Sequence, residues 1–553
     1  MARTLKTGLG ASMILVAGWL ALVPAGYLVW ETLSDADGFT LEHLRDAYGA
    51  DLLGDMAWNS LWFAVGTTLV AVPVGTALAF LVVRTDAPFR KTIVALSVLP
   101  LMVPGVVSTI GWILVASPRT GLVNAVFGSG TVDVFSPAGM VLVEAAQSVP
   151  LVFLLMAGAF ATTDATLEEA AVMSGARPLS VLRRITLPLA APALAASALV
   201  VAVRTLESFE VPALVGLPDG IWVFTSRIWR ALERLPADYG QAGAYALGLV
   251  VVIGIGVWLY WRVARDAGAL AGGHRARRLP LGRWRAAVGA AALGVVLLLV
   301  ALPLAMVLYT SLQPRFTAPS LDGLTRLGLG AYETVARDST SLTALRNSLL
   351  LAAGSATAAS ALTLFAAWLA VRAKVRGRRA MDFVLSTPLV IPGLVLGAAL
   401  LFVYLRAPVP VYGTLWILLI AYTTQALPYG MRFGAAALAQ VGAELEEAAQ
   451  VSGANRWQRA RRVLLPLVLP GLLAGWVFLA ISAMRDLAAS VVVAGPGSRV
   501  VAVRIFEQYE GGEMPEMAAL AVIELAVVAA LAVAALLAVR RGAPRLARLG
   551  SLT

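Results

Sequence analysis

The sequence contains no cysteine, only two histidines (His43 and His274) and only three lysines (Lys6, Lys91 and Lys374). Without cysteine the chain can form neither disulfides nor thiolate metal sites, and two histidines are too few for zinc centres of the Cys/His type. A phosphate-binding loop for ATP needs Gly-Lys followed by Ser or Thr, and none of the lysines follows a glycine. The patterns His-Glu-x-x-His and Gly-x-Ser-x-Gly are also missing, so we expect no enzyme.

Charge is scarce as well. Only 14% of the 553 residues are charged, 59% are hydrophobic and the mean hydropathy is +0.82. Soluble domains carry about 25% charged residues, so the composition indicates a polytopic membrane protein. The net charge of +11 could suggest nucleic-acid binding. However, the basic residues lie in short loops between apolar runs, which is the positive-inside pattern of membrane proteins, and we expect no nucleic-acid partner.

Apolar runs long enough to cross a membrane recur along the whole chain. A spanning helix needs about 20 apolar residues. The first run follows Arg3 and Lys6, and its length favours an uncleaved span over a signal peptide. We predict an all-α fold with twelve transmembrane helices, near 11–33, 57–83, 92–117, 138–161, 189–207, 241–262, 286–312, 345–371, 381–406, 412–437, 467–485 and 516–539.

Basic residues lie in every second loop and predict the orientation. They occupy the N-terminus, the C-terminal tail, and the loops 84–91, 162–188, 262–285, 372–379 and 440–466. The loop 31–57, on the opposite side, carries seven acids against Arg45. Because Arg and Lys concentrate on the cytoplasmic side, we expect both termini to be cytoplasmic.

The two halves of the chain repeat each other. Asn59-Ser60-Leu61 returns as Asn347-Ser348-Leu349, and Pro100-Leu101-Met102-Val103-Pro104-Gly105 returns as Pro388-Leu389-Val390-Ile391-Pro392-Gly393, both at the same offset (347 − 59 = 388 − 100 = 288). Later landmarks return at a second offset, as Gln147 does at Gln425 (425 − 147 = 278). Six spans restore the starting side, so the repeats are parallel and predict a pseudo-twofold axis along the membrane normal, with a solute path between the halves.

Each half contains one charged island between apolar runs. The first contains Glu168-Glu169-Ala170-Ala171 and Gly175 and continues to Ile185-Thr186-Leu187-Pro188; the second contains Glu446-Glu447-Ala448-Ala449 and Gly453 and continues to Val463-Leu464-Leu465-Pro466. Asp164 or Thr166 can cap a short helix, the glycine can make a turn, and a second amphipathic helix can lead into the next span. Such a unit could dock on a soluble partner, which the duplication predicts to be twofold symmetric, or lie on lipid headgroups.

The islands resemble the EAA motif of ABC importer permeases of type I. Glu169-Ala170-Ala171, Gly175 and Ile185-Thr186-Leu187-Pro188 match it, and the second copy departs only by Val463 in place of Ile. The resemblance covers nearly the whole chain, as two fused membrane domains of the bacterial inner membrane. It implies that Glu168 to Ala171, Gly175, Glu446 to Ala449 and Gly453 couple the chain to a homodimeric ATP-binding subunit. ATP and Mg²⁺ would then be bound by that partner, and this chain would bind no cofactor.

On this reading the chain divides into six segments. We expect a first helix and outer loop (1–55), a first membrane domain (56–262), a basic linker (263–285), a seventh helix and outer loop (286–344), a second membrane domain (345–540) and a tail (541–553).

Charged residues within or near the spans predict a translocation path. The first half offers Glu144, Arg204, Glu207, Ser208 and Glu210, and the place equivalent to Glu207 and Ser208 in the second half is occupied by Arg485 and Asp486. Alternatively, these charges pair with one another or reach the outer interface.

The cargo is predicted from a second resemblance. The segment from Leu206 to Pro218, with Val223 to Ile228, resembles fused permeases for ferric iron, although permeases for thiamine and aminoethylphosphonate share this layout. The chain offers only hard oxygen ligands and should bind metal weakly, so a separate solute-binding protein would supply the affinity. A proton-coupled transporter that uses Glu144, Glu207, Glu210 and Glu524 is the rival hypothesis; it does not explain the duplicated islands.

Overall fold

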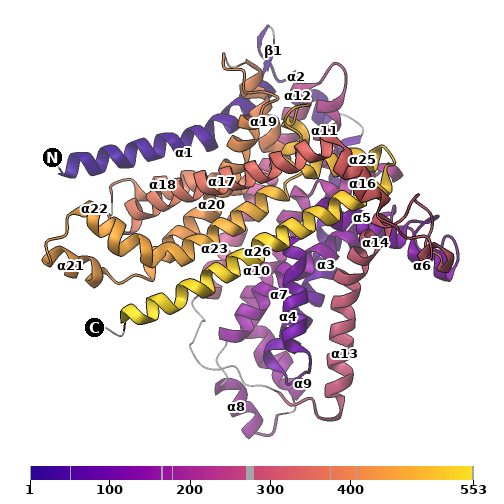
Figure 1. Cartoon of the computed structure of the whole chain (residues 1–553), viewed down its shortest axis with the longest axis horizontal. Coiled ribbons are helices and arrows are strands. Elements are labelled where there is room, and N and C mark those ends of the chain that lie inside the picture. The colour runs from indigo at the N-terminus through magenta and orange to yellow at the C-terminus, as the bar shows by residue number, and fades with distance from the viewer. Residues whose placement is uncertain are drawn as a thin grey trace. The chain divides into compact units, whose positions relative to one another are not determined.

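The computed structural model describes residues 2–35, 37–49, 52–162, 166–176, 178–268, 279–373, 375–406 and 408–550. The proposed cap Asp164 and most of the basic linker lie outside these ranges. The described chain is mainly helical, and loops and one hairpin of β1 (Ser34–Asp35) and β2 (Gly38–Phe39) connect its helices (Figure 1).

The helices follow one another in two similar series. The first half has α1 (Ala2–Thr32), α2 (Glu42–Gly49), α3 (Leu52–Arg84), α4 (Arg90–Val98), α5 (Gly105–Ala116), α6 (Leu122–Phe127), α7 (Pro137–Thr162), α8 (Thr166–Met173), α9 (Pro178–Val181), α10 (Leu187–Glu207), α11 (Phe224–Glu233) and α12 (Tyr239–Gly268). The second has α13 (Arg285–Val296), α14 (Leu302–Ser311), α15 (Leu321–Leu324), α16 (Gly330–Arg337), α17 (Ser339–Val371), α18 (Arg378–Ser386), α19 (Gly393–Arg406), α20 (Leu415–Ala439), α21 (Ala443–Val451), α22 (Arg456–Arg459), α23 (Leu465–Met484), α24 (Ser490–Val493), α25 (Val501–Glu510) and α26 (Met514–Gly550). Short 3₁₀ or π segments are η1 (Leu99–Met102), η2 (Leu182–Thr186), η3 (Pro212–Gly216), η4 (Leu217–Asp219), η5 (Gly282–Trp284), η6 (Leu297–Ala301), η7 (Thr387–Val390) and η8 (Ala460–Leu464).

Among the described residues, nine helices are long and apolar enough to cross a membrane, or eleven if each of two bent pairs counts as one span. Twelve were expected. The remaining segment forms α20, a helix of 25 residues. Tyr422, Thr423, Thr424 and Gln425 lie in its middle and lower its hydropathy, so it falls short of the other spans in composition although it has the expected length.

The third and ninth expected spans are not straight helices. Arg90–Met102 and Gly105–Ala116 meet at 110°, and Arg378–Val390 and Gly393–Arg406 meet at 105°. Each bend falls at the repeated Pro-Gly step. The residue before a proline avoids the helical region, and Val103 and Ile391 accordingly take extended backbone angles (ψ 130° and 109°). The sequence indicated the two apolar segments but not their bends, because hydropathy does not report the direction of the backbone.

The chain separates into two compact units that do not coincide with its two halves. Unit 1 comprises Met1–Phe39, Ala336–Arg504 and Ile523–Thr553, and unit 2 comprises Thr40–Val335 and Ile505–Val522. The first helix of each half therefore belongs to the unit that contains most of the other half. α1 lies in unit 1, and α13 and α14 lie in unit 2.

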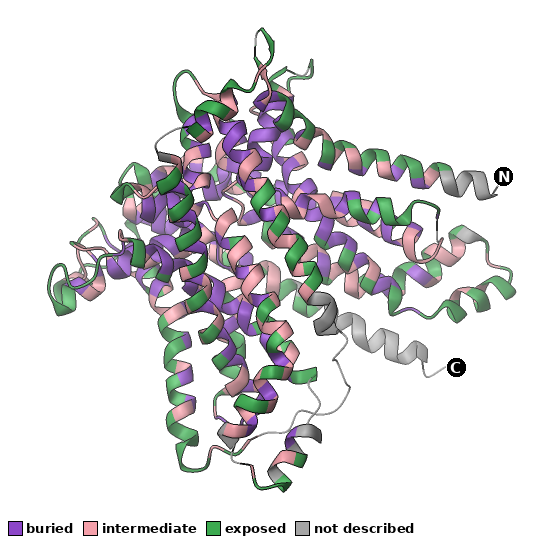
Figure 2. Ribbon diagram, turned by 180° about the vertical axis from the view of Figure 1, so that it is seen from behind, coloured by how far each residue is buried: buried purple, intermediate pink, exposed green. Residues whose placement is uncertain are grey.

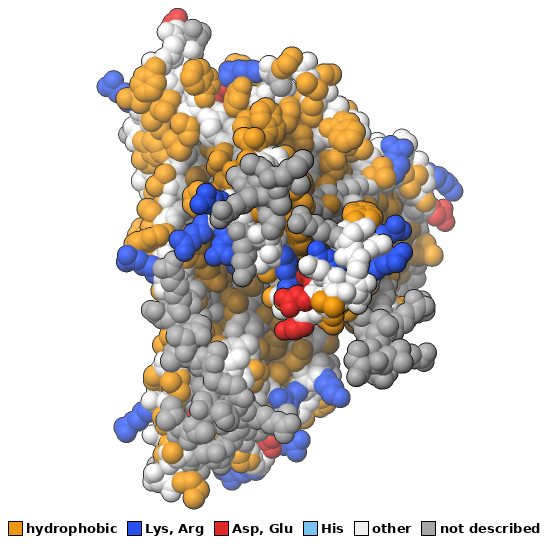
Figure 3. Space-filling model, turned by 90° about the vertical axis from the view of Figure 1, so that its left-hand side faces the viewer, with side chains coloured by type: hydrophobic (Ala, Val, Ile, Leu, Met, Phe, Trp, Pro, Cys, Tyr) orange, Lys and Arg blue, Asp and Glu red, His pale blue; other side chains and the backbone are white. Residues whose placement is uncertain are grey.

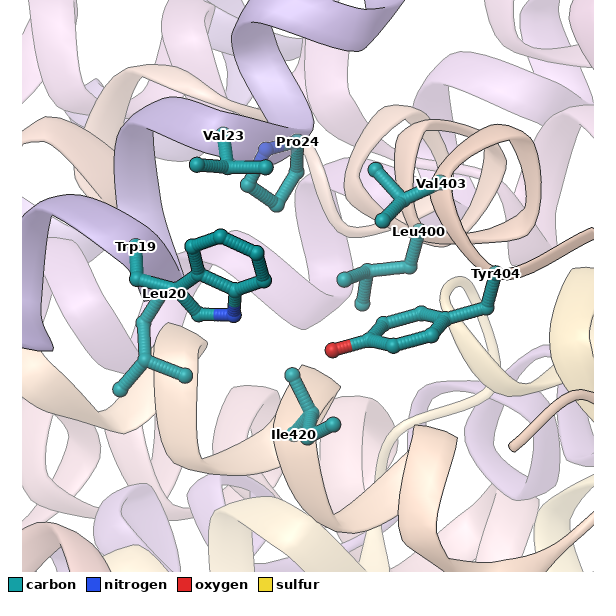
Figure 4. Close-up of a pocket in the computed structure, with 8 residues that line it drawn as sticks. All are labelled: Trp19, Leu20, Val23, Pro24, Leu400, Val403, Tyr404 and Ile420. Atoms are coloured by element: carbon teal, nitrogen blue, oxygen red, sulfur yellow. The ribbon is translucent and has the colours of Figure 1, made fainter. Parts of the chain in front are cut away.

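Packing explains this exchange. In unit 1, Met13 and Ala17 of α1 share a buried core with Met381, Leu385 and Leu427. α1 also lines a small apolar pocket with α19 and α20, formed by Trp19, Leu20, Val23, Pro24, Leu400, Val403, Tyr404 and Ile420 (Figure 4).

The equivalent helices of the second half pack in unit 2. Ala292 and Val296 of α13 share a core with Ala71, Phe153 and Phe160. A Cβ atom at Gly111 of α5 would come within 2.9 Å of Pro303 of α14, so only glycine permits this close approach.

Candidate functional site

Both islands have the expected local structure of helix, glycine turn and second helix. In the first, α8 ends at Met173 and is followed by Gly175, whose φ of 83° suits glycine, and Ala176 N donates to Ala171 O at 3.0 Å. In the second, α21 is followed by Gly453 at φ 84°, and Ala454 N donates to Ala449 O at 3.0 Å. This bond from two residues beyond the helix is the Schellman motif, and it turns both chains in the same way. The second segments, α9 with η2 and α22 with η8, then run into α10 and α23.

Each island exposes an apolar residue at the same place. Met173 is 87% exposed and Val451 is 90% exposed, and they are equivalent because 451 − 173 = 278. α21 has no buried residue, and it is drawn mainly in the exposed colour in Figure 2. Figure 3 faces the end of unit 1 that carries α21 and shows acidic and basic side chains among hydrophobic ones. Exposed apolar residues within a charged surface are typical of an interaction site.

The glutamates of the motif have different surroundings. Glu168 is 2% exposed and points into the protein, whereas Glu447 is exposed. The alanines after them are exposed or half-buried. The side chain of Glu169 lies outside the described part of the structure. Glu168 therefore binds inside the protein, although the resemblance placed it among the residues that couple the chain to the ATP-binding subunit.

A buried ion pair holds the first island to the end of α3. The Arg84 guanidinium donates through Nη2 to Glu168 Oε1, and the two side chains are 1% and 2% exposed. Thr186 Oγ1 in η2 donates to the same carboxylate oxygen at 2.7 Å. One carboxylate thus joins α3, α8 and η2, and it neutralises a guanidinium that would otherwise be buried without a counter-charge.

The second island has an equivalent but more exposed pair. Arg372 Nε lies 3.2 Å from Glu446 Oε1, with side-chain exposures of 17% and 22%, in a geometry that is not aligned as a hydrogen bond. Arg372 also donates through Nη2 to the carbonyls of Leu438, at 3.0 Å, and Val441. Thr186 has no hydroxyl counterpart, because its equivalent is Leu464. The offsets 372 − 84 = 288 and 446 − 168 = 278 match those of the repeat, and this was the signal that could have revealed both pairs.

The candidate path residues of the first half lie together in unit 2. Ser208 Oγ donates to Glu144 Oε2 at 2.8 Å, and Thr225 Oγ1 donates to the carbonyl of Ser208 at 2.8 Å. Glu144 interacts electrostatically with Glu210 and Arg204, and Glu207 also interacts with Arg204. Arg204 is therefore close enough to influence both carboxylates, as the alternative of mutual pairing expects.

Glu210 also lies at the bend between η1 and α5. A Cβ atom at Gly105 would be 3.3 Å from Glu210 Oε1, so the carboxylate covers the first residue of α5. The free N–H groups at a helix N-terminus attract negative charge.

The second half places a different set at the equivalent positions, in unit 1. Tyr422 is the equivalent of Glu144 and Asp486 the equivalent of Ser208, at one offset (422 − 144 = 486 − 208 = 278). Tyr422 Oη and Ser490 Oγ are 2.6 Å apart, and Ser490 Oγ donates to Asp486 Oδ1 at 3.0 Å. Acid and hydroxyl have thus exchanged places between the repeats. The sequence analysis missed Tyr422 and Ser490, and the exchange of residue types hides them from a search for identical residues.

Two further charges of the second half interact with each other. Glu524 is fully buried, neither of its carboxylate oxygens has a hydrogen-bond partner, and it interacts electrostatically with Arg485. Arg485 therefore has a counter-charge within its own unit. In the part of the chain that the structure describes, no three Asp, Glu, His or Cys side chains are grouped so that they could hold a metal ion.

The chain resembles known transport proteins over most of its length. The family model for the binding-protein-dependent transport system inner membrane component matches it twice, at residues 71–265 and 360–548. "Probable ABC transporter permease protein y4fN" of Sinorhizobium fredii is 29% identical over 430 residues, 75% of this chain and 74% of the relative. Ferric transport system permease protein FbpB of Actinobacillus pleuropneumoniae is 24% identical over 518 residues, 91% of this chain and 74% of the relative.

A third relative is shorter. A protein of Salmonella typhi named for 2-aminoethylphosphonate transport, PhnV, is 28% identical over 244 residues, 44% of this chain and 91% of the relative. The two family matches together cover more than half of the chain, one in each repeat. The chain therefore belongs to the family of binding-protein-dependent transport system inner membrane components, as the fused two-domain permease subunit of an ABC importer.

Proposed function

We propose that this permease carries iron(III) across the bacterial inner membrane, driven by a separate homodimeric ATP-binding subunit. The observation that carries the proposal is the pair of islands. Two surfaces with the same Schellman turn and the same exposed apolar position suit two identical subunits of a symmetric partner.

The partner would bind and hydrolyse ATP with Mg²⁺, and the islands would receive its motion. Met173 and Val451 would enter apolar grooves on the partner, and Glu169 and Glu447 would make the charged contacts beside them. Closure of the ATPase dimer would then move both islands together and shift the permease between inward- and outward-open states. This requires the islands and both termini to be cytoplasmic, as the distribution of Arg and Lys indicates.

Iron(III) is supported by the relative named for ferric transport, which aligns with 91% of the chain. The carboxylates of Glu144, Glu207 and Glu210 are hard oxygen ligands, which suit a hard cation. Because no three acids of the described chain are grouped as a metal site, these carboxylates would hold the ion weakly, and weak binding favours release during transport. A solute-binding protein on the loops 31–57, 209–240, 313–344 and 486–515 would supply the affinity.

Two alternatives are carried forward. The relative named for 2-aminoethylphosphonate transport has similar identity to one repeat, so a phosphonate is the second candidate cargo, with thiamine as a third. A proton-coupled mechanism would use Glu144, Glu207, Glu210 and Glu524 as relay groups. The carboxylate oxygens of Glu524, which have no hydrogen-bond partner, favour this candidate. However, a proton-coupled mechanism does not explain why the islands are duplicated.

The test is purification of the chain from its own cells, followed by reconstitution with the proteins that co-purify and with a candidate binding protein. The permease should co-purify with an ATPase in a ratio of one permease to two ATP-binding subunits, and ATP hydrolysis in proteoliposomes should rise when the binding protein is loaded with iron(III). Equal stimulation by 2-aminoethylphosphonate or thiamine would remove iron from the proposal. Proton-driven uptake by the permease alone would refute ATP coupling.

A further inference from the structure

The helices α3 and α17 are anchored at both ends by contacts that recur in the two repeats. At one end, Arg84 at the last residue of α3 binds Glu168 of the first island, and Arg372 at the end of α17 pairs with Glu446 of the second. We call each of these pairs an inner joint. Each inner joint is a tertiary contact, because it joins a spanning helix to an island that lies far from it in the sequence.

The opposite ends are held to short helices that follow the fifth and eleventh expected spans. Asn59 Nδ2 donates to the carbonyl of Trp222 at 3.2 Å, and Phe224 N, the first N–H of α11, donates to Ser60 Oγ at 3.3 Å. In this way α3 caps the N-terminus of α11 from outside that helix, a position where a hydroxyl acceptor is preferred.

The second repeat makes the same connection. Asn347 Nδ2 donates to the carbonyls of Gly497 and Arg499 at 3.3 and 2.9 Å, and Val501 N, the first N–H of α25, donates to Ser348 Oγ at 2.9 Å. Asn347 is fully buried and Ser348 is 2% exposed. We call the contacts of Asn59-Ser60 and Asn347-Ser348 the outer joints. The repeated Asn-Ser dipeptide of the sequence therefore acquires a role in both halves.

The two joints of each helix are separated by about the thickness of a membrane. The separation in sequence from Ser60 to Arg84 equals that from Ser348 to Arg372 (84 − 60 = 372 − 348 = 24). A helix rises about 1.5 Å per residue, so each pair of joints is about 36 Å apart, slightly more than the roughly 30 Å hydrocarbon core.

The short helices α11 and α25 are themselves a repeat. Arg227-Ile228-Trp229 with Glu233 returns as Arg504-Ile505-Phe506 with Glu510, at one offset (504 − 227 = 510 − 233 = 277). Within unit 2, the Trp229 and Phe506 rings pack edge to face with centroids 5.8 Å apart, and both pack on Phe209. Equivalent residues of two repeats that touch each other are a feature of a twofold contact.

We infer that α3 and α17 act as rigid rods. When the coupling islands move, each rod carries that displacement to α11 or α25 on the other side of the membrane. The positioning residues are Arg84, Glu168, Asn59 and Ser60, with their counterparts in the second repeat. The inference rests on the proposed coupling of the islands to an ATPase. Displacement of an island can also pass along the chain itself, because each island leads directly into α10 or α23. The rods add a second route for the same displacement. Displacement of the two rods would then shift α11 against α25 at the contact between Trp229 and Phe506.

The chain lacks cysteine, so a single introduced thiol reports on one place. Glu233→Cys puts the reporter on α11, where the native side chain is 45% exposed. The full permease–ATPase complex is reconstituted in proteoliposomes, and labelling by a membrane-impermeant maleimide is followed without nucleotide and after trapping with ATP and vanadate. We call the permease that carries only Glu233→Cys the parent. Its labelling rate should differ several-fold between the nucleotide-free and the vanadate-trapped complex.

Breaking the outer joint should remove this response. In Asn59→Ala/Ser60→Ala we expect ATPase binding and vanadate trapping to persist, the labelling rate to become independent of nucleotide, and uptake to fall. Ser60→Thr keeps the hydroxyl acceptor and should restore the response. Thr68→Ala is the matched control, because Thr68 lies on the same helix and donates to the carbonyl of Ala64 in its own helix.

The outcomes separate the two proposals. A parent-like response in Asn59→Ala/Ser60→Ala would overturn the rod. Loss of the response in Thr68→Ala as well would also overturn it, since any change in α3 would then suffice. If no ATPase co-purifies with the Glu233→Cys permease, the proposed function is refuted, and the rod is refuted with it because it rests on that coupling. A rod for the second repeat is tested in the same way with Glu510→Cys and Ser348→Ala.

Discussion

The buried pair of Arg84 and Glu168 gives a sharp prediction because the second repeat carries a matched control. Glu168→Gln removes the counter-charge of a guanidinium that is 1% exposed and already has unpaired Nε and Nη1 atoms. Breaking a buried ion pair on one side typically costs about 3–5 kcal/mol. Glu446→Gln makes the same change to a pair with 17% and 22% exposure, where water can solvate Arg372, and we expect a cost nearer the ~1 kcal/mol of exposed pairs.

The assay is thermal unfolding of the purified permease in detergent at a fixed scan rate, since unfolding of such proteins is often irreversible. Glu168→Gln should unfold at a clearly lower temperature than Glu446→Gln. Arg84→Gln/Glu168→Gln should recover most of the loss, because no buried charge remains alone. Equal losses for the two single variants, or a double variant no better than Glu168→Gln, would refute the reasoning from burial.

Three further predictions follow from local geometry. Gly175→Val or Gly453→Val should leave the protein in the membrane but uncouple ATPase activity from uptake. Open space surrounds each turn, but a β-branched residue resists a φ near +84°. Normal uptake by either variant would contradict this prediction. Asp338 caps α17 through Thr340 N and Ser341 N at 3.0 Å. Loss of such a cap typically costs roughly 1 kcal/mol, so Asp338→Ala should lower the apparent unfolding temperature in the same thermal assay. Asp322→Ala, on an exposed pair, should leave that temperature unchanged. Burial and the nearby Glu233 and Glu507 raise the pKa of Glu510, so the native state favours the protonated acid and loses stability as pH rises through that raised pKa. Glu510→Gln should flatten this dependence above about pH 4, where an ordinary glutamate titrates, and an unchanged pH profile would count against it.

The sequence predicted the features that depend on local pattern. Long apolar runs indicated the spans, and the charged island with its glycine indicated two short helices and a turn; Gly175 and Gly453 lie where the turn requires them. A helix, a cap and a glycine turn depend on residues within a few positions of each other. Local chemistry therefore sufficed for them.

Contacts between distant segments were not predictable in this way. Arg84 belonged to the basic loop 84–91 and Glu168 to the motif that couples to the ATP-binding subunit, and nothing in either neighbourhood indicates that they bind each other. The bends at Val103 and Ile391 show a second limit. Their prolines were recognised as a repeated landmark, but an apolar run reads the same whether its helix is straight or turns by 110°. The pairing of repeated residues at fixed offsets is the signal that links such positions.

The exchange of first helices has a consequence for biosynthesis. Met13 and Ala17 of α1 pack on Met381 and Leu385, which are synthesised much later (381 − 13 = 368). At roughly 5–20 residues per second, α1 leaves the ribosome roughly 20–70 s before its packing surface exists. During this interval α1 must remain in the bilayer with its apolar face against lipid. Maturation of unit 1 is therefore limited by completion of the second half, and a chain truncated after the linker would leave its first helix without a partner.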